Sequence, residues 1–305
     1  MQHWQMKLIM SVQRPSSDSD TAALLREWLT GTFETLGGDL RQRLLEAGPL
    51  PEGSFKSRQP IGEPGDIWAY VASTTRTARG VRNTGKEYSE ATWQKFLGGL
   101  AKKVPASGTL GLCTIDQFGT PNGGRPKMTI QYDIDEHDEG WLHLAFLFDP
   151  ALLEDPAWQQ ALLTHARRFA DEHGPTYAEV SYWSGYSNQS ALEYRFKVTE
   201  QLPIARSRST LRGYAWVTVC PQEAGDRLGG LEALQASGAF STAEPLQAGG
   251  YWLQATPSYA DYDMTAGTKV FTTLAPALRP GTPRPPAPHE PAEKIILRDA
   301  AEISA

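Results

Sequence analysis

Hydrophobic and polar residues follow two different periods along this chain, and the period predicts where strands and helices lie. Strands are expected where apolar residues alternate with polar ones, or run together, between turn residues. These segments are residues 4–10, 67–75, 109–115, 127–134, 140–148, 177–183, 212–219 and 249–256. The three in the middle of the chain are separated only by short turns and predict an antiparallel meander. The first has the alternation of an edge strand.

Helices are expected where apolar residues recur every three or four positions. One stripe runs from residue 18 to 44 and is interrupted by Gly37 and Gly38, and a second covers 88–100. The best-marked helix is 156–173. Asp155 suits its N-cap, Pro156 suits its first turn, and Gly174 stands where a left-handed residue ends a helix.

The order of these elements lacks the regular β–α alternation of a parallel doubly wound sheet. We therefore predict an α+β fold with a mainly antiparallel sheet and helices packed on one face. Residues 1–280 are expected to form one α+β domain. A division of this domain into sub-halves 1–200 and 201–280 stays open. Segments 109–184 and 211–279 are candidates for two halves of similar topology. Residues 281–305 are rich in proline and should form a partly extended tail.

Composition and charge narrow the classes of function. The net charge of −6 argues against a direct nucleic-acid binder, which needs a basic face, and suits a basic partner. The first ten residues lack the apolar core of a signal peptide, and no run has the roughly 18 apolar residues of a membrane helix. We expect a cytoplasmic protein that does not enter membranes. Cys113 and Cys220 lie in apolar runs and should be buried, reduced thiols.

Each candidate motif for catalysis or metal binding lacks a residue or a spacing that its chemistry requires. Gly80 to Lys86 has the frame of a phosphate-binding loop, but Glu87 stands where that loop needs Ser or Thr, so we expect a mobile polar loop. The acidic segment 133–139 departs from a calcium loop, because Asp138 replaces the glycine that the loop requires. The six histidines show no metal-ligand spacing. We therefore expect no catalytic residue, no metal and no cofactor.

Two clusters are candidate partner-binding residues. An acidic turn joins two strands of the meander, and it would suit a basic partner; its residues are Asp133, Asp135, Glu136, Asp138 and Glu139. Large aromatic side chains stand beside Ser, Gly and Asn after the strand 177–183, a composition typical of binding surfaces. The aromatic candidates are Tyr182, Trp183 and Tyr186. A core role for part of this cluster stays open.

A resemblance to a known family rests on the segment Leu211 to Pro280. It contains, in order, Gly213-Tyr214-Ala215-Trp216-Val217-Thr218, Leu228-Gly229-Gly230, Gly249-Gly250 before an apolar strand, and Leu278-Arg279-Pro280 after a closing helix. This pattern resembles the C-terminal half of bacterial immunity proteins of the immunity protein 52 and type VI immunity families. The region 48–85 and the proline-rich tail have no counterpart in that pattern. The motif residues are mostly apolar residues, glycine and proline, which serve structure. The resemblance therefore supports a shared fold more strongly than a shared partner.

The resemblance implies a non-catalytic protein that binds a cognate protein toxin, often a nuclease, and neutralises it in the producing or neighbouring bacterial cell. Two other functions stay open at this point. One is an enzyme of unrecognised class with a small-molecule pocket lined by Tyr182, Trp183 and Trp252. The other is a structural or regulatory scaffold.

Overall fold

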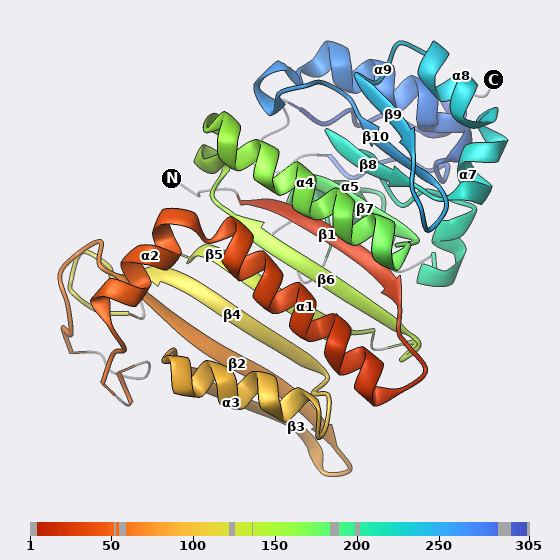
Figure 1. Cartoon of the computed structure of the whole chain (residues 1–305). Helices are drawn as coiled ribbons and strands as arrows, with labels where there is room; N and C mark the ends of the chain where they lie inside the picture. Colours follow the sequence, from red (N-terminus) through yellow and green to blue (C-terminus); the bar gives the residue numbers. More distant parts are fainter. Residues whose placement is uncertain are drawn as a thin grey trace. The chain divides into compact units, whose positions relative to one another are not determined.

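The computed structural model describes residues 5–51, 53–54, 59–121, 126–135, 137–183, 189–198, 202–285 and 294–303. The chain forms two compact units, each of which is described by itself (Figure 1). The N-terminal unit is Arg14–Phe148, and the C-terminal unit combines Met1–Gln13 with Asp149–Ala305. The boundary between the units follows Phe148 and does not coincide with the division at residue 200 considered above. That residues 1–280 behave as one domain stays a prediction.

The N-terminal unit contains five antiparallel strands in the order β3-β2-β4-β5-β6. They are β2 (Ile67–Thr77), β3 (Gly80–Glu87), β4 (Ser107–Thr114), β5 (Pro126–Ile134) and β6 (Trp141–Phe148). One face carries an apolar row that crosses the sheet, because Leu110 pairs with Ile130 and Ile130 pairs with Phe146. All three side chains are buried. The expected meander is confirmed as β4, β5 and β6.

Three helices cover this face (Figure 1). They are α1 (Asp18–Leu36), α2 (Gly38–Ala47) and α3 (Glu90–Leu100). The Trp28 indole on α1 donates a hydrogen bond of 3.1 Å to the carbonyl of Gln131 on β5. The break at Gly37 has a steric cause: a Cβ there would lie 2.4 Å from the Phe33 carbonyl oxygen. The predicted interruption of the helical stripe is confirmed.

The C-terminal unit also contains five antiparallel strands, in the order β1-β7-β8-β10-β9. They are β1 (Met6–Gln13), β7 (Tyr177–Tyr182), β8 (Val217–Cys220), β9 (Thr242–Pro245) and β10 (Tyr251–Gln254). Its α-helices are α4 (Pro156–His173), α5 (Ala191–Arg195), α7 (Gln222–Arg227), α8 (Gly230–Ala236) and α9 (Met264–Leu274). Short 3₁₀ turns connect them at Pro150–Glu154, Ile204–Arg208, Tyr259–Asp261, Ala275–Ala277 and Ala300–Glu302.

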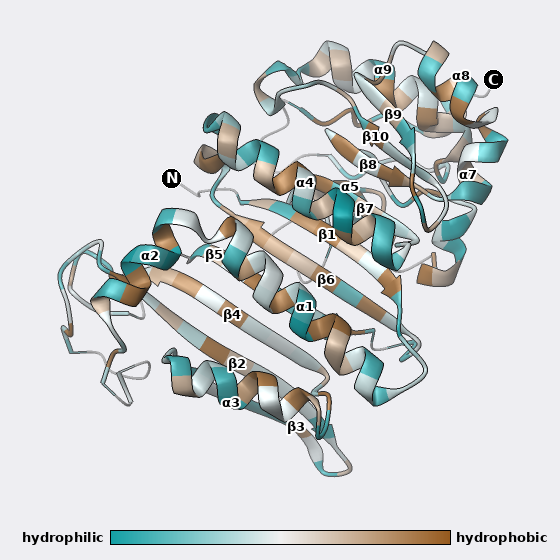
Figure 2. Cartoon of the chain, in the orientation of Figure 1, coloured by the Kyte–Doolittle hydropathy of each residue, from teal (hydrophilic) through white to brown (hydrophobic). Residues whose placement is uncertain are grey.

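Helix α4 forms where the sequence predicted it. The Asp155 side chain accepts the Ala157 N–H at 2.9 Å, and Gly174 has the left-handed conformation with φ of 53°. Figure 2 shows polar residues along α4 and α2, whereas β6 is mostly hydrophobic. Together with the antiparallel pairing in both units, these helices confirm the α+β class. Among the described residues, no helix has both the length and the apolar character needed to cross a lipid bilayer.

Three local predictions were wrong. Gly80 to Lys86 is not a loop but most of strand β3, because each residue pairs with β2 across a tight turn. Strand β1 is buried from Met6 through Val12, including its polar positions, so it lacks the exposed face of an edge strand. The strand expected at 212–219 begins only at Val217. The pairing of β3 with β2 depends on a neighbouring segment, which a single strand's sequence does not encode.

Part of the C-terminal tail packs on its own unit. The Tyr214 hydroxyl donates to the Ile296 carbonyl at 2.8 Å, and Ile296 is buried. The Lys294 ammonium donates to the Tyr259 carbonyl at 2.9 Å and lies 4.0 Å from the centre of the Tyr259 ring. The tail therefore contributes to the core through residues 294–303.

Candidate functional site

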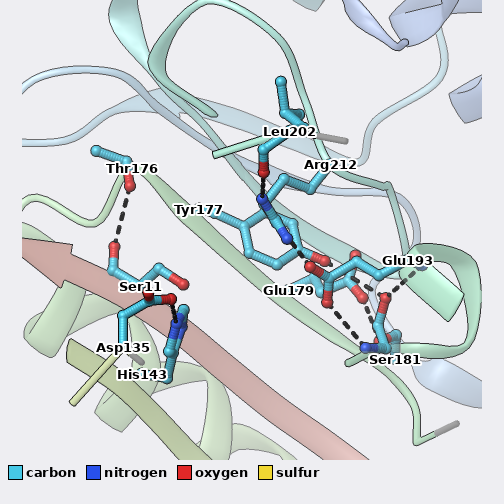
Figure 3. Close-up of polar contacts among 11 residues, drawn as sticks. Ser11, Asp135, His143, Thr176, Tyr177, Glu179, Ser181, Glu193, Leu202 and Arg212 are labelled. Atoms are coloured by element: carbon cyan, nitrogen blue, oxygen red, sulfur yellow. Dashed lines mark hydrogen bonds and ion pairs between the residues drawn. The ribbon is translucent and has the colours of Figure 1, made fainter. Parts of the chain in front are cut away.

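In the predicted acidic turn, the Asp135 carboxylate forms hydrogen bonds within the turn and to the next strand. The Asp135 carboxylate accepts the N–H groups of His137 and Asp138 at 2.8 and 2.9 Å, and it contacts the His143 ring nitrogen at 2.7 Å (Figure 3). The hydrogen bond to His143 lowers the pKa of Asp135 far below its usual range, and the two backbone N–H groups lower it further. Only 16% of the Asp135 side chain is exposed. Asp135 therefore fixes the turn.

The remaining acidic candidates differ in exposure. Asp133 is half-buried on β5 opposite His143. Asp138 is exposed and accepts the Gly140 N–H at 3.0 Å, and Glu139 is exposed 4.0 Å from the Arg76 guanidinium. Glu136 lies outside the described residues. The accessible carboxylates of this turn are thus Asp138 and Glu139 among those described.

Among the described residues, the aromatic candidates do not line one common pocket of the kind considered for an enzyme. Tyr182 lies at the end of β7, packs edge-on against Tyr259 and lines a cavity of only about 20 Å³. Trp183 is half-buried and forms a β-bridge with Ser190. Trp252 lines a different depression on β10. Tyr186 lies outside the described residues. Among the described residues, Tyr182 and Trp252 therefore face separate cavities.

The depression lined by Trp252 is an open groove of about 650 Å³ in the C-terminal unit. Its floor is one face of the β9–β10 pair, because Thr242 lies opposite Gln254 and Glu244 opposite Trp252. Its wall is one face of α4, where helical spacing aligns Gln160, Thr164, Arg167 and Asp171. We call this feature the α4–β9 groove.

Charged side chains that pair with one another line part of the α4–β9 groove. The Arg167 guanidinium pairs with Glu244 across the groove and lies 3.9 Å from Asp171 on its own helix. Asp171 also accepts the Gln247 N–H at 2.9 Å. The groove therefore presents amides, hydroxyls and paired charges, which suit the hydrogen-bonding groups of a protruding protein loop. Sequence analysis missed it, although the polar face of α4 was a usable signal.

A second polar cluster is enclosed in the core of the C-terminal unit (Figure 3). The Arg212 guanidinium contacts Glu193 at 2.6 Å and donates to the Leu202 carbonyl at 2.6 Å. Glu179 on β7 accepts a hydrogen bond of 2.5 Å from the Ser181 hydroxyl. Arg212, Glu193 and Glu179 are each at most 4% exposed. We call Glu179, Glu193 and Arg212 the buried ionic cluster.

The buried ionic cluster holds two carboxyl groups and one guanidinium. Burial, followed by the negative charge of Glu193, raises the pKa of Glu179 to about 7. Gly213, in the motif that carries the family resemblance, meets this cluster, since a Cβ there would lie 3.0 Å from the Glu179 carboxylate. Arg212 links the segment before β8 to α5 through Glu193, and to β7 through the Tyr177 ring, whose centre lies 5.9 Å from the guanidinium. No local pattern in the sequence indicated that Glu193 and Arg212 would pair.

Both cysteines are free and buried, as predicted. Burial raises the pKa of Cys113 and of Cys220 to about 12, so each remains a thiol at neutral pH. A nucleophilic role for either thiol would require a thiolate and access, which these surroundings disfavour.

Comparison with known proteins gives a likeness of fold. No protein-family model matches the chain, and no curated protein matches it in sequence. Among solved structures, the chain is similar to the Pseudomonas aeruginosa T6SS protein PA0821, with a TM-score of 0.54 and 12% identity. The match covers 99% of this chain and 81% of that protein. The likeness of fold thus extends across nearly the whole chain.

Proposed function

We propose that this chain is a non-catalytic immunity-type protein that binds and neutralises a cognate protein toxin, such as a nuclease, in the producing or neighbouring bacterial cell. The observation that carries the proposal is the likeness of fold to a T6SS protein over 99% of the chain. It agrees with the resemblance of Leu211 to Pro280 to immunity proteins. This argument passes from fold to function by analogy, and it therefore needs a functional test.

The physical properties of the chain support a role in binding. Its net charge of −6 would accelerate association with a basic toxin, because opposite charges steer the encounter. The exposed carboxylates of Asp138 and Glu139 are the acidic contacts that we propose, with Tyr182 and Trp183 as aromatic contacts. The α4–β9 groove adds a polar concave surface for a protruding loop.

The deciding experiment expresses each reading frame next to the gene, alone and together with this chain. We expect one neighbour to arrest growth alone, growth to return when this chain is present, and the two proteins to elute as one complex. Failure of every neighbour to bind this chain or to be neutralised by it would overturn the proposal.

The acidic contact has its own test in the same system. Reversing two charges with Asp138→Lys and Glu139→Lys should slow toxin association at least about tenfold at low salt. Glu223→Lys with Glu232→Lys is the matched control, because these exposed carboxylates lie on α7 and α8 of the other unit. Equal association rates for both double variants would remove the acidic turn from the interface. Asp135 is left intact because its carboxylate fixes the turn.

A further inference from the structure

Strand β3 ends the β3-β2-β4-β5-β6 order of the N-terminal unit and leaves one edge of that sheet open. Among the described residues, β3 pairs with β2 alone. It is eight residues long and exposed at every position except Glu87, which is half-buried. Val81 is 67% exposed. An open edge of this length presents unpaired N–H and C=O groups to another extended chain.

The register shows which backbone groups face outward. Thr77 and Gly80 close the two-residue turn, and farther along the same ladder the Tyr88 N–H bonds to the Ala69 carbonyl at 2.8 Å. Hydrogen-bonded pairs alternate with non-bonded pairs in an antiparallel ladder. The even-numbered residues of β3 therefore bond to β2. The N–H and C=O groups of Val81, Asn83 and Gly85 point to the open side.

The β2–β3 hairpin is positively charged although the whole chain carries −6. Its basic residues are Arg76, Arg79, Arg82 and Lys86, and its one acidic residue is Glu87 at the end of β3. Arg82 and Lys86 lie on the same face of β3, since side chains alternate along a strand. Arg79 occupies the turn, and both it and Arg82 are exposed.

We propose that β3 is a docking edge for an extended acidic segment of a partner protein, which adds to the sheet as an antiparallel strand. Its N–H and C=O groups pair with Val81, Asn83 and Gly85. Its carboxylates lie opposite Arg82 and Lys86, which places them four residues apart on the incoming strand. This inference does not rest on the proposed function, because the partner need not be a toxin.

Charge selects this occupant over a second copy of the chain. If two β3 strands paired antiparallel with Thr84 opposite Thr84, Arg82 of each copy would face Lys86 of the other. Like charges directly opposite destabilise such a pair. The same basic side chains disfavour that register of self-pairing and attract an acidic strand.

The test uses the full chain and a fluorescent peptide, acetyl-Thr-Glu-Val-Thr-Val-Glu-Thr-amide, with fluorescence anisotropy as the readout. A peptide with Lys in place of both Glu residues is the charge control. We expect the acidic peptide to bind at least about tenfold more tightly than the Lys peptide, and Arg82→Glu to abolish this preference. Equal binding of the two peptides would overturn the proposal.

A backbone variant separates strand addition from simple charge attraction. Gly85→Pro removes an N–H that points outward while leaving the bonds of β3 to β2 in place, as proline is tolerated at such edge positions. Gly85→Pro should weaken binding of the acidic peptide at least about tenfold and leave the melting temperature of the protein unchanged. Thr84→Pro, which removes an inward N–H, should instead lower the melting temperature.

Three further outcomes would also overturn the proposal. The first is peptide binding that Gly85→Pro leaves unchanged. The second is tighter binding of a DNA duplex that displaces the peptide. If Arg82→Glu abolishes this DNA binding and Gly85→Pro does not, the edge is a nucleic-acid surface that acts through charge alone. Dimerisation of the unmodified chain through β3, detected by loss of the dimer in Gly85→Pro, would assign the edge to a second copy instead.

Discussion

The two units use the same antiparallel architecture but hold it together differently. In the N-terminal unit the five strands have between 8 and 11 residues, so continuous ladders supply most of the backbone pairing. In the C-terminal unit β8, β9 and β10 have four residues each. There, a buried ion pair and buried side-chain bonds to the backbone supplement the short ladders, as Arg212 pairs with Glu193 and bonds to the Leu202 carbonyl.

This difference teaches where ionisable groups belong in each unit. In the described part of the N-terminal unit, no Asp, Glu, Lys or Arg side chain is buried. The C-terminal unit instead encloses the buried ionic cluster. There, the Arg212 side chain connects its own segment to Glu193 and to the Leu202 carbonyl. We therefore expect the C-terminal unit to be more sensitive to the loss of a single charged side chain.

The largest effect should come from Arg212→Met. It leaves Glu193 buried without its cation, and breaking a buried pair in this way costs about 3–5 kcal/mol of unfolding free energy. Chemical denaturation followed by tryptophan fluorescence measures the loss. Arg168→Met on the exposed face of α4 is the control and should cost less than about 1 kcal/mol. Similar losses for both variants would contradict the comparison.

The next effect is the pH dependence from Glu179. Its pKa rises from 4.5 in the unfolded chain to about 7 in the folded protein, so the folded state binds the proton more tightly. The stabilisation is complete below pH 4.5 and is lost as pH rises towards 7, a change of about 3 kcal/mol. Glu179→Gln should remove this dependence. Denaturation midpoints at several pH values test it, and a slope unchanged in Glu179→Gln would assign it to another group.

A smaller effect is expected from Asp135→Ala in the N-terminal unit. It removes the acceptor for two N–H groups and for His143, at a cost of about 2 kcal/mol. Because the folded pKa of Asp135 is lowered, its contribution is present above pH 3.8 and is lost as pH falls through the folded pKa. Thermal denaturation at neutral pH measures it. Asp138→Ala, with one N–H bond, should cost less.

The smallest effect on stability should come from Arg167→Ala. The Arg167–Glu244 pair is partly exposed, with 35% and 46% of the two side chains accessible, so its loss should cost less than about 1 kcal/mol. If the α4–β9 groove contacts the toxin, the same variant should weaken binding much more than it weakens folding. Calorimetric titration with the toxin compares the two. A loss of stability larger than that of Asp135→Ala would make the pair structural.

Several elements could be predicted because their signals are local. Asp155, Pro156 and Gly174 define α4 through contacts within one helical turn, and Gly37 divides α1 from α2 through its own lack of a Cβ. The candidate site was less predictable. Asp135 was expected on the surface, but its role depends on His143 from the next strand, and the α4–β9 groove depends on strands about eighty residues beyond α4.

The sequence by itself therefore determined the α+β class, the best-marked helix, the central meander and the burial of both cysteines, because period, capping and apolar character act over a few residues. Only the tertiary structure decided that Gly80 to Lys86 is an open-edged strand. It alone also brought Arg212, Glu193 and Glu179 into one enclosed cluster. These outcomes depend on pairing and desolvation between segments distant in sequence, for which no local pattern exists.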